Sequence, residues 1–349
     1  MRRLLVNRPL VARQSKLNGG SPLKLTIKDV AEKAGVSKAT ISRYLNGRFE
    51  HMSDATKAHI AAVIAELNYT PSRQASSLKT HRSHLIGVVV ADISNIYSTL
   101  LISGINKVTQ QSMDQILIND AANDLKREEK ALEMLLSMNV DGIIMQPLSA
   151  VAHHYDLIRD SQTPMVLVDR LTRPLAWPTV TADDYRSTTK LAQAIHKSHY
   201  RDILILINPI AQISTRQSRY QAFLDTFKNT ATTVTLLETE NDSVAPLATW
   251  LEAHPQTHPL VFAANGRLLM ATLRWLHAKG LRIPQDIAIS GYDDWDWAEL
   301  VTPGISAVSQ HPDVIGTTAA QLLAQQIAGE PVAVQRLEIP AEVRIRSSF

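Results

Sequence analysis

The spacing of apolar positions changes along the chain near residue 84. Before that point, apolar residues recur with a helical period in segments that begin at Thr26, Ser37 and Ser53. This period is typical of amphipathic helices, and Ser and Thr are favoured at helix starts because their side chains cap open N–H groups. The pattern predicts three short helices between residues 26 and 70.

The first two predicted helices lie close together in the chain, with Gly35 ending the first and Ser37 starting the second. Two short helices joined by a turn of about four residues form the helix-turn-helix arrangement. The second helix would expose short hydroxyls and cations, which suit DNA phosphates and base edges. This part of the chain is therefore a candidate DNA-binding head.

After residue 84, short apolar runs rich in β-branched residues alternate with amphipathic segments. Such runs are typical of buried strands, and the alternation predicts parallel sheets covered by helices. In a first series we expect strands at 85–90, 115–118, 142–145 and 165–168, with helices at 97–111, 124–138 and 150–160. In a second series we expect helices at 184–198, 215–228, 243–253, 265–279 and 312–328, with strands at 203–207, 233–237, 260–263 and 286–290. Segments 162–183 and 291–311 would cross between two lobes.

Charge divides the chain at the same place. Residues 1–84 hold 15 Lys and Arg against 5 Asp and Glu, whereas the remainder holds 21 against 28. A basic head on an acidic body indicates that the head meets a polyanion. Residues 1–24 are basic too, but their apolar stretches are too short for a signal peptide, and we predict a disordered extension there.

The head resembles that of the lactose-repressor (LacI/GalR) family. The resemblance rests on TIKDVAEKAGVSKATISRYLN at 26–46, ELNYTP at 66–71 and ASSL at 75–78. It implies a helix-turn-helix DNA-binding domain over 25–71, a hinge helix and linker over 72–83, and an effector-binding and dimerisation body over 84–349. The implied fold is a small all-α head plus an α/β body of two doubly wound lobes, like a periplasmic binding protein.

The resemblance also implies which residues contact an operator. Lys38, Ala39, Thr40 and Arg43 would face the major groove, and Leu78 of each subunit would wedge into the minor groove. A wedge of this kind kinks the duplex, and two symmetric wedges need a dimer on a pseudo-palindromic site. The other expected DNA-binding residues are Thr26, Ser37, Ser42, Asn46, Ser72 and Ala75.

Polar residues at the ends of the predicted strands form a candidate effector site. Ligands of such sheets bind beyond the carboxyl ends of the strands. The candidates from strand ends are Asp92, Asn95, Gln146, Asp169, Arg170, Arg216, Arg219, Asn265 and Asp293. The resemblance adds Tyr97 and Gln310, and it matches Arg219 to the arginine that grips the effector in the family. Gly266 departs from the family pattern, which usually has Asp after this Asn.

The effector class remains open between a sugar acid and a neutral sugar. Arg170, Arg216 and Arg219 together could hold an anion by bidentate bonds, or they could simply pair with Asp169 or Asp293. Residues 90–95, with Asn119, Asn123 and Asp124, also resemble the branch of the family that responds to ketodeoxygluconate. We therefore favour a sugar acid.

Several function classes lack support in the sequence. The chain has no cysteine, no Gly-rich phosphate loop and no Gly-x-Ser-x-Gly elbow, and its histidines lack metal-ligand spacing. It also has no apolar run of about 18 residues. We expect no enzymatic activity, cofactor, metal or membrane partner.

The expected protein is a cytoplasmic, nucleoid-associated homodimer that represses carbohydrate catabolic genes from double-stranded operator DNA. A sugar or sugar-acid effector would release it. The alternatives are a global regulator that depends on an effector or a protein corepressor, and a sugar-binding transport protein.

Overall fold

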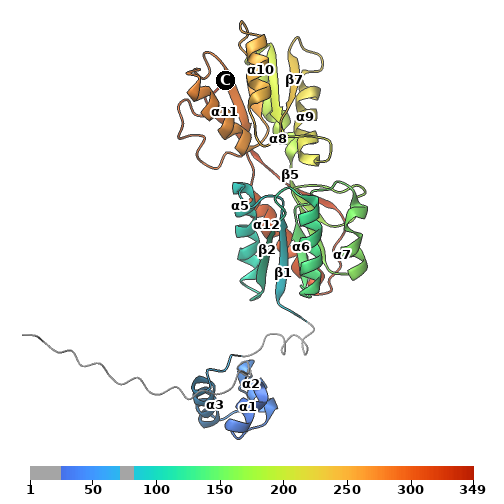
Figure 1. The fold of residues 1–349 in the computed structure, drawn as a ribbon, viewed down its shortest axis with the longest axis vertical. Coiled ribbons are helices and arrows are strands. Elements are labelled where there is room, and N and C mark those ends of the chain that lie inside the picture. Colours follow the sequence, from blue (N-terminus) through green and yellow to red (C-terminus); the bar gives the residue numbers. More distant parts are fainter. Residues whose placement is uncertain (1–24, 71–81) are drawn as a thin grey trace, which may run out of the picture. The chain divides into compact units, whose positions relative to one another are not determined.

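The computed structural model describes residues 25–70 and 82–349. Contacts divide the chain into a unit that ends at His81 and a unit from Arg82 to Phe349. Figure 1 shows a small helical head and a larger body of two α/β lobes. No helix in the described ranges is long and apolar enough to cross a membrane.

The head contains the three expected helices, α1 (Ile27–Lys33), α2 (Lys38–Leu45) and α3 (Asp54–Glu66). Side-chain caps set their starts: the Ser37 hydroxyl accepts a hydrogen bond from the Thr40 N–H, and the Ser53 hydroxyl accepts one from Thr56. The apolar faces of the helices meet in one core. Its buried members are Val30, Ala31, Ala34, Ile41, Ile60, Val63 and Tyr69.

The first lobe is a parallel six-stranded sheet in the order β11-β5-β4-β3-β1-β2. Its strands are β1 (Leu85–Val90), β2 (Gln115–Asp120), β3 (Gly142–Met145), β4 (Met165–Val168), β5 (Thr179–Ala182) and β11 (Arg336–Ile339). Its helices are α5 (Ile96–Thr109), α6 (Leu125–Ser137), the 3-10 turn η1 (Ala152–Tyr155), α7 (Asp156–Ser161) and α12 (Pro312–Ile327). In Figure 1, α5 and α12 lie on one side of this sheet, and α6 and α7 on the other.

The second lobe is a six-stranded sheet in the order β12-β10-β9-β8-β6-β7, in which β12 alone runs antiparallel to its neighbour. Its strands are β6 (Asp202–Ile207), β7 (Thr233–Glu238), β8 (Leu260–Ala263), β9 (Ala288–Tyr292), β10 (Ser306–Ser309) and β12 (Glu342–Arg344). Its helices are α8 (Asp184–His196), α9 (Ser214–Phe227), α10 (Ala245–Ala253) and α11 (Gly266–Ala278). The two doubly wound lobes of the prediction are therefore confirmed.

The placement of the last predicted helix in the second series is wrong. The chain crosses between the lobes after β5, returns after β10 so that α12 joins the first lobe, and crosses again between β11 and β12. Ile315, Ala319 and Leu323 of α12 belong to the first lobe's core. Apolar periodicity predicts a buried helix face but carries no information about which sheet covers it.

The same reasoning missed four short strands. β5 and β10 lie inside the segments predicted as crossovers, and β11 and β12 follow the last predicted helix. Each has only three or four residues. Unlike the equally short strands β3, β4 and β8, they contain polar residues and form no continuous apolar run, so only their neighbours in the sheets identify them as strands.

Candidate functional site

The outer face of α2 carries free cations. Lys38, Ala39 and Arg43 are exposed, and neither cation has an ion-pair partner within residues 25–70. By contrast, Lys33 pairs with Glu66 and Lys57 with Asp54. Because Lys38 and Arg43 are not neutralised by the protein, they are available to phosphates and base edges.

The other polar residues predicted on this surface also hold the helix ends. The Asn46 side-chain amide donates to the Ser42 carbonyl oxygen over 2.7 Å, and the Thr26 N–H donates to Asp29 over 2.7 Å. The bond from the Thr26 N–H holds the pKa of Asp29 below its usual value. Three other predicted contacts, Ser72, Ala75 and Leu78, lie outside the described residues.

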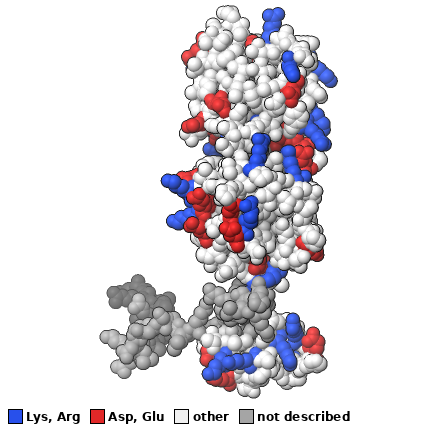
Figure 2. Space-filling model, turned by 90° about the vertical axis from the view of Figure 1, so that its right-hand side faces the viewer, with Lys and Arg blue, Asp and Glu red and all other residues white. Residues whose placement is uncertain are grey.

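The surface of the body carries charges of both signs. Figure 2 shows its acidic and basic side chains interspersed on the face drawn. Interspersed charges do not produce the extended positive potential that attracts a polyanion. This face of the body therefore offers no surface suited to a polyanion.

A cavity of about 530 Å³ opens between the two lobes, at the carboxyl ends of their strands. Its size falls within the usual range for small-molecule sites. All eleven residues predicted for the effector site line it: Asp92, Asn95, Tyr97, Gln146, Asp169, Arg170, Arg216, Arg219, Asn265, Asp293 and Gln310. The structure thus brings together residues from seven separate segments of the chain.

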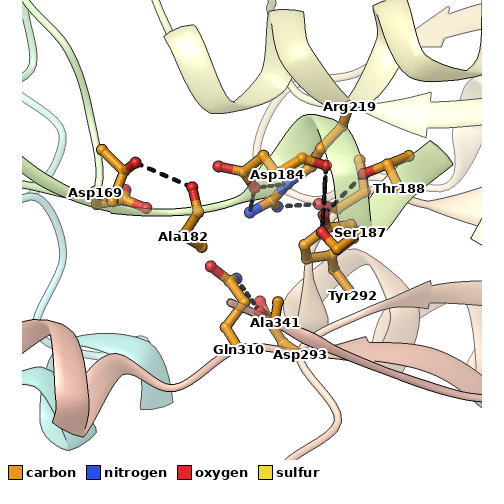
Figure 3. A network of polar contacts seen from close by, with 12 residues as sticks. Asp169, Ala182, Asp184, Ser187, Thr188, Arg219, Tyr292, Asp293, Gln310 and Ala341 are labelled. Carbon is orange, nitrogen blue, oxygen red and sulfur yellow. Dashed lines mark hydrogen bonds and ion pairs between the residues drawn. The ribbon is translucent and has the colours of Figure 1, made fainter. Parts of the chain in front are cut away.

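Arg219 is the most firmly held of these side chains. Its Nε and Nη2 donate to the Asp184 carboxylate over 2.8 and 2.7 Å, and its Nη1 donates to the Ala264 carbonyl oxygen over 2.6 Å. The guanidinium also lies over the Tyr292 ring, with its carbon 3.7 Å from the ring centroid. Figure 3 shows this network, in which Tyr292 is bonded in turn by Ser187 and Thr188 from α8.

Burial dominates the acid–base properties of the network. It raises the pKa of Asp184 to about 6, against the opposing effect of Arg219. Burial would lower the pKa of Arg219, but the Asp184 carboxylate outweighs it and keeps the pKa raised. Asp184 and Arg219 thus form a mutually compensated pair behind the cavity wall.

Asp293 has a different environment. Its Oδ1 accepts a bond from the Gln310 amide over 2.6 Å, and its Oδ2 accepts one from the Gly266 N–H over 2.9 Å. It has no cation partner in the described ranges, and burial raises its pKa. A Cβ at Gly266 would lie 2.8 Å from the Asp293 Cβ, which is too close. Gly266 therefore allows the close approach of its own N–H to this carboxylate.

The first lobe contributes a second set of polar groups. Gln146 accepts from the Ala91 N–H and donates to Asp169 over 2.6 Å, while Asn95 caps α5 through the Tyr97 N–H. These bonds fix the strand ends that form this wall of the cavity.

Three cavity-lining side chains keep a buried polar atom without a hydrogen-bond partner in the described structure. They are the Tyr97 hydroxyl, Nε of Arg170 and Oε1 of Gln310. Buried polar groups are nearly always bonded, and an exception calls for a functional explanation. A hydroxylated ligand with donors and acceptors would satisfy all three.

The sequence reasoning missed an arginine at the mouth of the cavity. Arg267 of α11 donates to Asp92 over 2.6 Å and to Ser94 over 3.0 Å, both in the first lobe. Its Nε lies 2.6 Å from the Asp242 carboxylate of the second lobe. Arg267 therefore bridges the lobes, although its position on a helix carried no sequence signal for this.

Two further partners were missed for different reasons. Asn208 follows β6 directly and accepts a bond from the Asn265 amide over 2.7 Å, so its strand-end position could have identified it. Asp184 lies at the start of α8, and its pairing with Arg219 depends on the fold. Trp295 and Trp297 do not line the cavity; they pack against the apolar clusters of the first and second lobes respectively.

Comparisons with known proteins cover both units. A family model described as "Bacterial regulatory proteins, lacI family" matches residues 26–72. A model described as "Periplasmic binding protein-like domain" matches residues 192–349.

Curated relatives are similar over almost the whole chain. The HTH-type transcriptional regulator KdgR of Bacillus subtilis (strain 168) is 35% identical over 333 residues, which cover 93% of this chain and 97% of that protein. The HTH-type transcriptional regulator PtxS of Pseudomonas plecoglossicida is 34% identical over 328 residues, which cover 93% and 96%.

Among solved structures, a lac repressor dimer bound to operator and the anti-inducer ONPF has the same fold. It is 22% identical, with a TM-score of 0.80, over 93% of this chain and 98% of that one.

Proposed function

This chain belongs to the lacI family of bacterial regulatory proteins and is a DNA-binding regulator of transcription, and we propose that it represses carbohydrate catabolic genes until a small effector releases it from its operator. The helix-turn-helix with unpaired cations on α2 supports the DNA-binding role. Three unsatisfied polar atoms in the interlobe cavity support the effector role.

At the operator, we assign the major groove to Lys38, Ala39, Thr40 and Arg43. The sharpest test compares Arg43→Ala with Lys33→Ala, because Lys33 is a cation of the same head that already pairs with Glu66. Arg43→Ala should weaken operator binding by about 1–3 kcal/mol, while Lys33→Ala should have little effect. Fluorescence anisotropy with operator DNA measures both, and equal losses in the two variants would contradict the assignment.

For the minor groove we propose Leu78 as the wedge of each subunit of a homodimer, flanked by contacts from Ser72 and Ala75. Leu78→Ala should reduce specific but not nonspecific binding, because the kink at the centre of the site would be lost. If Leu78→Ala leaves the operator affinity unchanged, Leu78 does not act as a minor-groove wedge. We also propose that the protein is a cytoplasmic homodimer. Sedimentation of the purified protein should show a dimer, and a stable tetramer would contradict this.

We favour a sugar acid over a neutral sugar as effector, because arginines and hydrogen-bonding carboxylates line the same cavity. Calorimetric titration with ketodeoxygluconate, gluconate, ribose and galactose tests the class, and addition of the ligand to the operator complex tests release. An acid that binds and lowers operator affinity would support the proposal. Binding of a neutral sugar alone would exclude a sugar acid as the effector, but the role as a transcriptional regulator would stand.

A protein corepressor is the remaining alternative. The absence of detectable binding by all four ligands would favour it. A transport binding protein is not favoured, since such a protein has no use for the helix-turn-helix head. The relatives are transcriptional regulators, and we propose no catalytic role for the cavity.

A further inference from the structure

We propose that Arg170, Arg216 and the start of α9 form a subsite for the carboxylate of the effector, whereas Arg219 only offers hydrogen bonds to its hydroxyls. This inference rests on the proposed sugar-acid effector and assigns its two ends to different parts of the cavity. It separates three arginines that the sequence grouped together.

Arg170 is the first component. Its side chain is nine-tenths buried, yet its Nε has no hydrogen-bond partner among the described residues. It forms a long ion pair of 3.4 Å with Oδ2 of Asp169, an oxygen that already accepts a bond of 2.6 Å from Gln146. Its Nη1 reaches only the Pro147 carbonyl oxygen, over a long 3.4 Å. A buried guanidinium with a free N–H is poised to bind an anion.

Arg216 is the second component and comes from the other lobe. Its Nη1 donates to the Pro209 carbonyl oxygen over 2.9 Å, and it has no ion-pair partner in the described ranges. Burial and the neighbouring cations Arg170 and Arg219 lower the pKa of Arg216 to about 10. Like charges brought together in a partly desolvated place repel, and a bound anion between them would relieve that repulsion.

The start of α9 is the third component. Ile213 is its N-cap and provides no side-chain cap, so the first N–H groups of this 14-residue helix remain available. Ile213, Thr215 and Arg216 all line the cavity. The Ser214 hydroxyl accepts a bond of 3.0 Å from the Leu171 N–H, which joins the residue after Arg170 to this helix start. An open helix N-terminus favours negative charge.

Arg219 differs in one respect that decides its role. Asp184 neutralises it at 2.7 Å, and a carbonyl oxygen takes a third N–H. Its remaining N–H groups can donate to hydroxyls, but its charge is already compensated. The opposite end of the cavity, with Asp293 and Gln310, likewise suits hydroxyls rather than an anion.

The test uses gluconate and its neutral counterpart sorbitol, which has an alcohol in place of the carboxylate, with calorimetry on the full chain. Ketodeoxygluconate and inorganic phosphate are titrated beside them. In Arg170→Gln and Arg216→Gln, the affinity for the acid that binds should fall about 10- to 100-fold, and the acid should lose its preference over sorbitol. Arg186→Gln removes an exposed charge outside the cavity and should change neither affinity.

Three results would overturn the subsite. Unchanged acid affinity in both Gln variants, or equal losses for acid and sorbitol, would show that the two arginines do not select the carboxylate. Phosphate bound as tightly as the acid would show a site for free anions only. These results would leave the proposed sugar-acid effector intact. If the unaltered chain binds no acid at all, the proposed effector class fails together with the subsite.

Discussion

At the residue scale, the central feature of the cavity is the buried pair of Arg219 and Asp184. Two charges removed from water are stabilised only while both are present, because the loss of one leaves the other unpaired in a poorly solvated place. Tyr292 covers the guanidinium and is itself held by two hydroxyls of α8. The pair therefore joins α8 and α9 at the wall of the cavity.

Arg219→Ala should abolish the effector response and lower the free energy of unfolding by about 3–5 kcal/mol, because Asp184 would remain buried without its cation. Urea unfolding measures the second effect, and operator release on addition of effector measures the first. The double variant Asp184→Asn with Arg219→Gln removes both charges and should recover much of the stability. A normal response in the folded double variant would mean that Arg219 has no part in effector binding.

The pH dependence of stability should contain a contribution from Asp184. Its folded pKa of about 6 lies above the unfolded value of about 3.9. A raised pKa means that the folded state binds the proton more tightly, so this contribution is complete below about pH 3.9 and is lost as pH rises through about 6. The stability of the unaltered chain relative to Asp184→Asn should therefore decrease from pH 4 to pH 7. Urea unfolding at several pH values measures the difference, and a difference that is flat or rises with pH would contradict the raised pKa.

At the scale of elements, the contact between α5 and α12 assigns the late helix to the first lobe. Gly104 and Gly316 face each other's helix so closely that a Cβ at Gly104 would lie 2.0 Å from the Asp313 carbonyl oxygen, and one at Gly316 2.2 Å from that of Leu101. Only a residue without a side chain lets the two backbones approach this far. The Thr317 hydroxyl adds a bond to the Gly104 carbonyl oxygen over 3.2 Å.

Gly316→Ala should destabilise the body by about 1–3 kcal/mol or more, because the methyl group can fit only if α12 moves away from α5. Thermal unfolding of the body measures the loss. Gln321→Ala changes an exposed residue of the same helix and should stay within about 0.5 kcal/mol. Equal stability of Gly316→Ala and the unaltered chain would show that the helices do not pack this closely.

At the scale of the whole molecule, the proposed release by an effector requires that effector binding be coupled to DNA binding. The effector can release the operator only if it binds the DNA-incompetent arrangement more tightly, and DNA must then weaken effector binding by the same factor. The chain enters the first lobe at Arg82–His84, where Asp141 accepts bonds from the N–H groups of Ser83 and His84 over 2.7 and 3.0 Å. These bonds hold Ser83 and His84 to the first lobe.

The bridge of Arg267 to Asp92 and Asp242 should slow the exchange of effector, since it ties the lobes together at the mouth of the cavity. Arg267→Lys keeps the charge but loses the planar fork, so it should speed both association and dissociation about two- to tenfold. Stopped-flow tryptophan fluorescence measures both rates. Arg282→Lys alters an exposed arginine outside the cavity and serves as control; rates equal to those of this control would show that the bridge is no gate.

The sequence by itself determined the helix-turn-helix, the alternation of strands and helices, and eleven of the residues that line the cavity, of which Tyr97 and Gln310 came from the family resemblance. These features depend on local periods, on capping residues and on the rule that polar strand ends meet at one edge of a parallel sheet. The tertiary structure alone decided that α12 belongs to the first lobe, that Asp184 compensates Arg219 and that Arg267 bridges the lobes. Each of these depends on which distant segments come into contact, and neither periodicity nor the identity of a single residue encodes that choice.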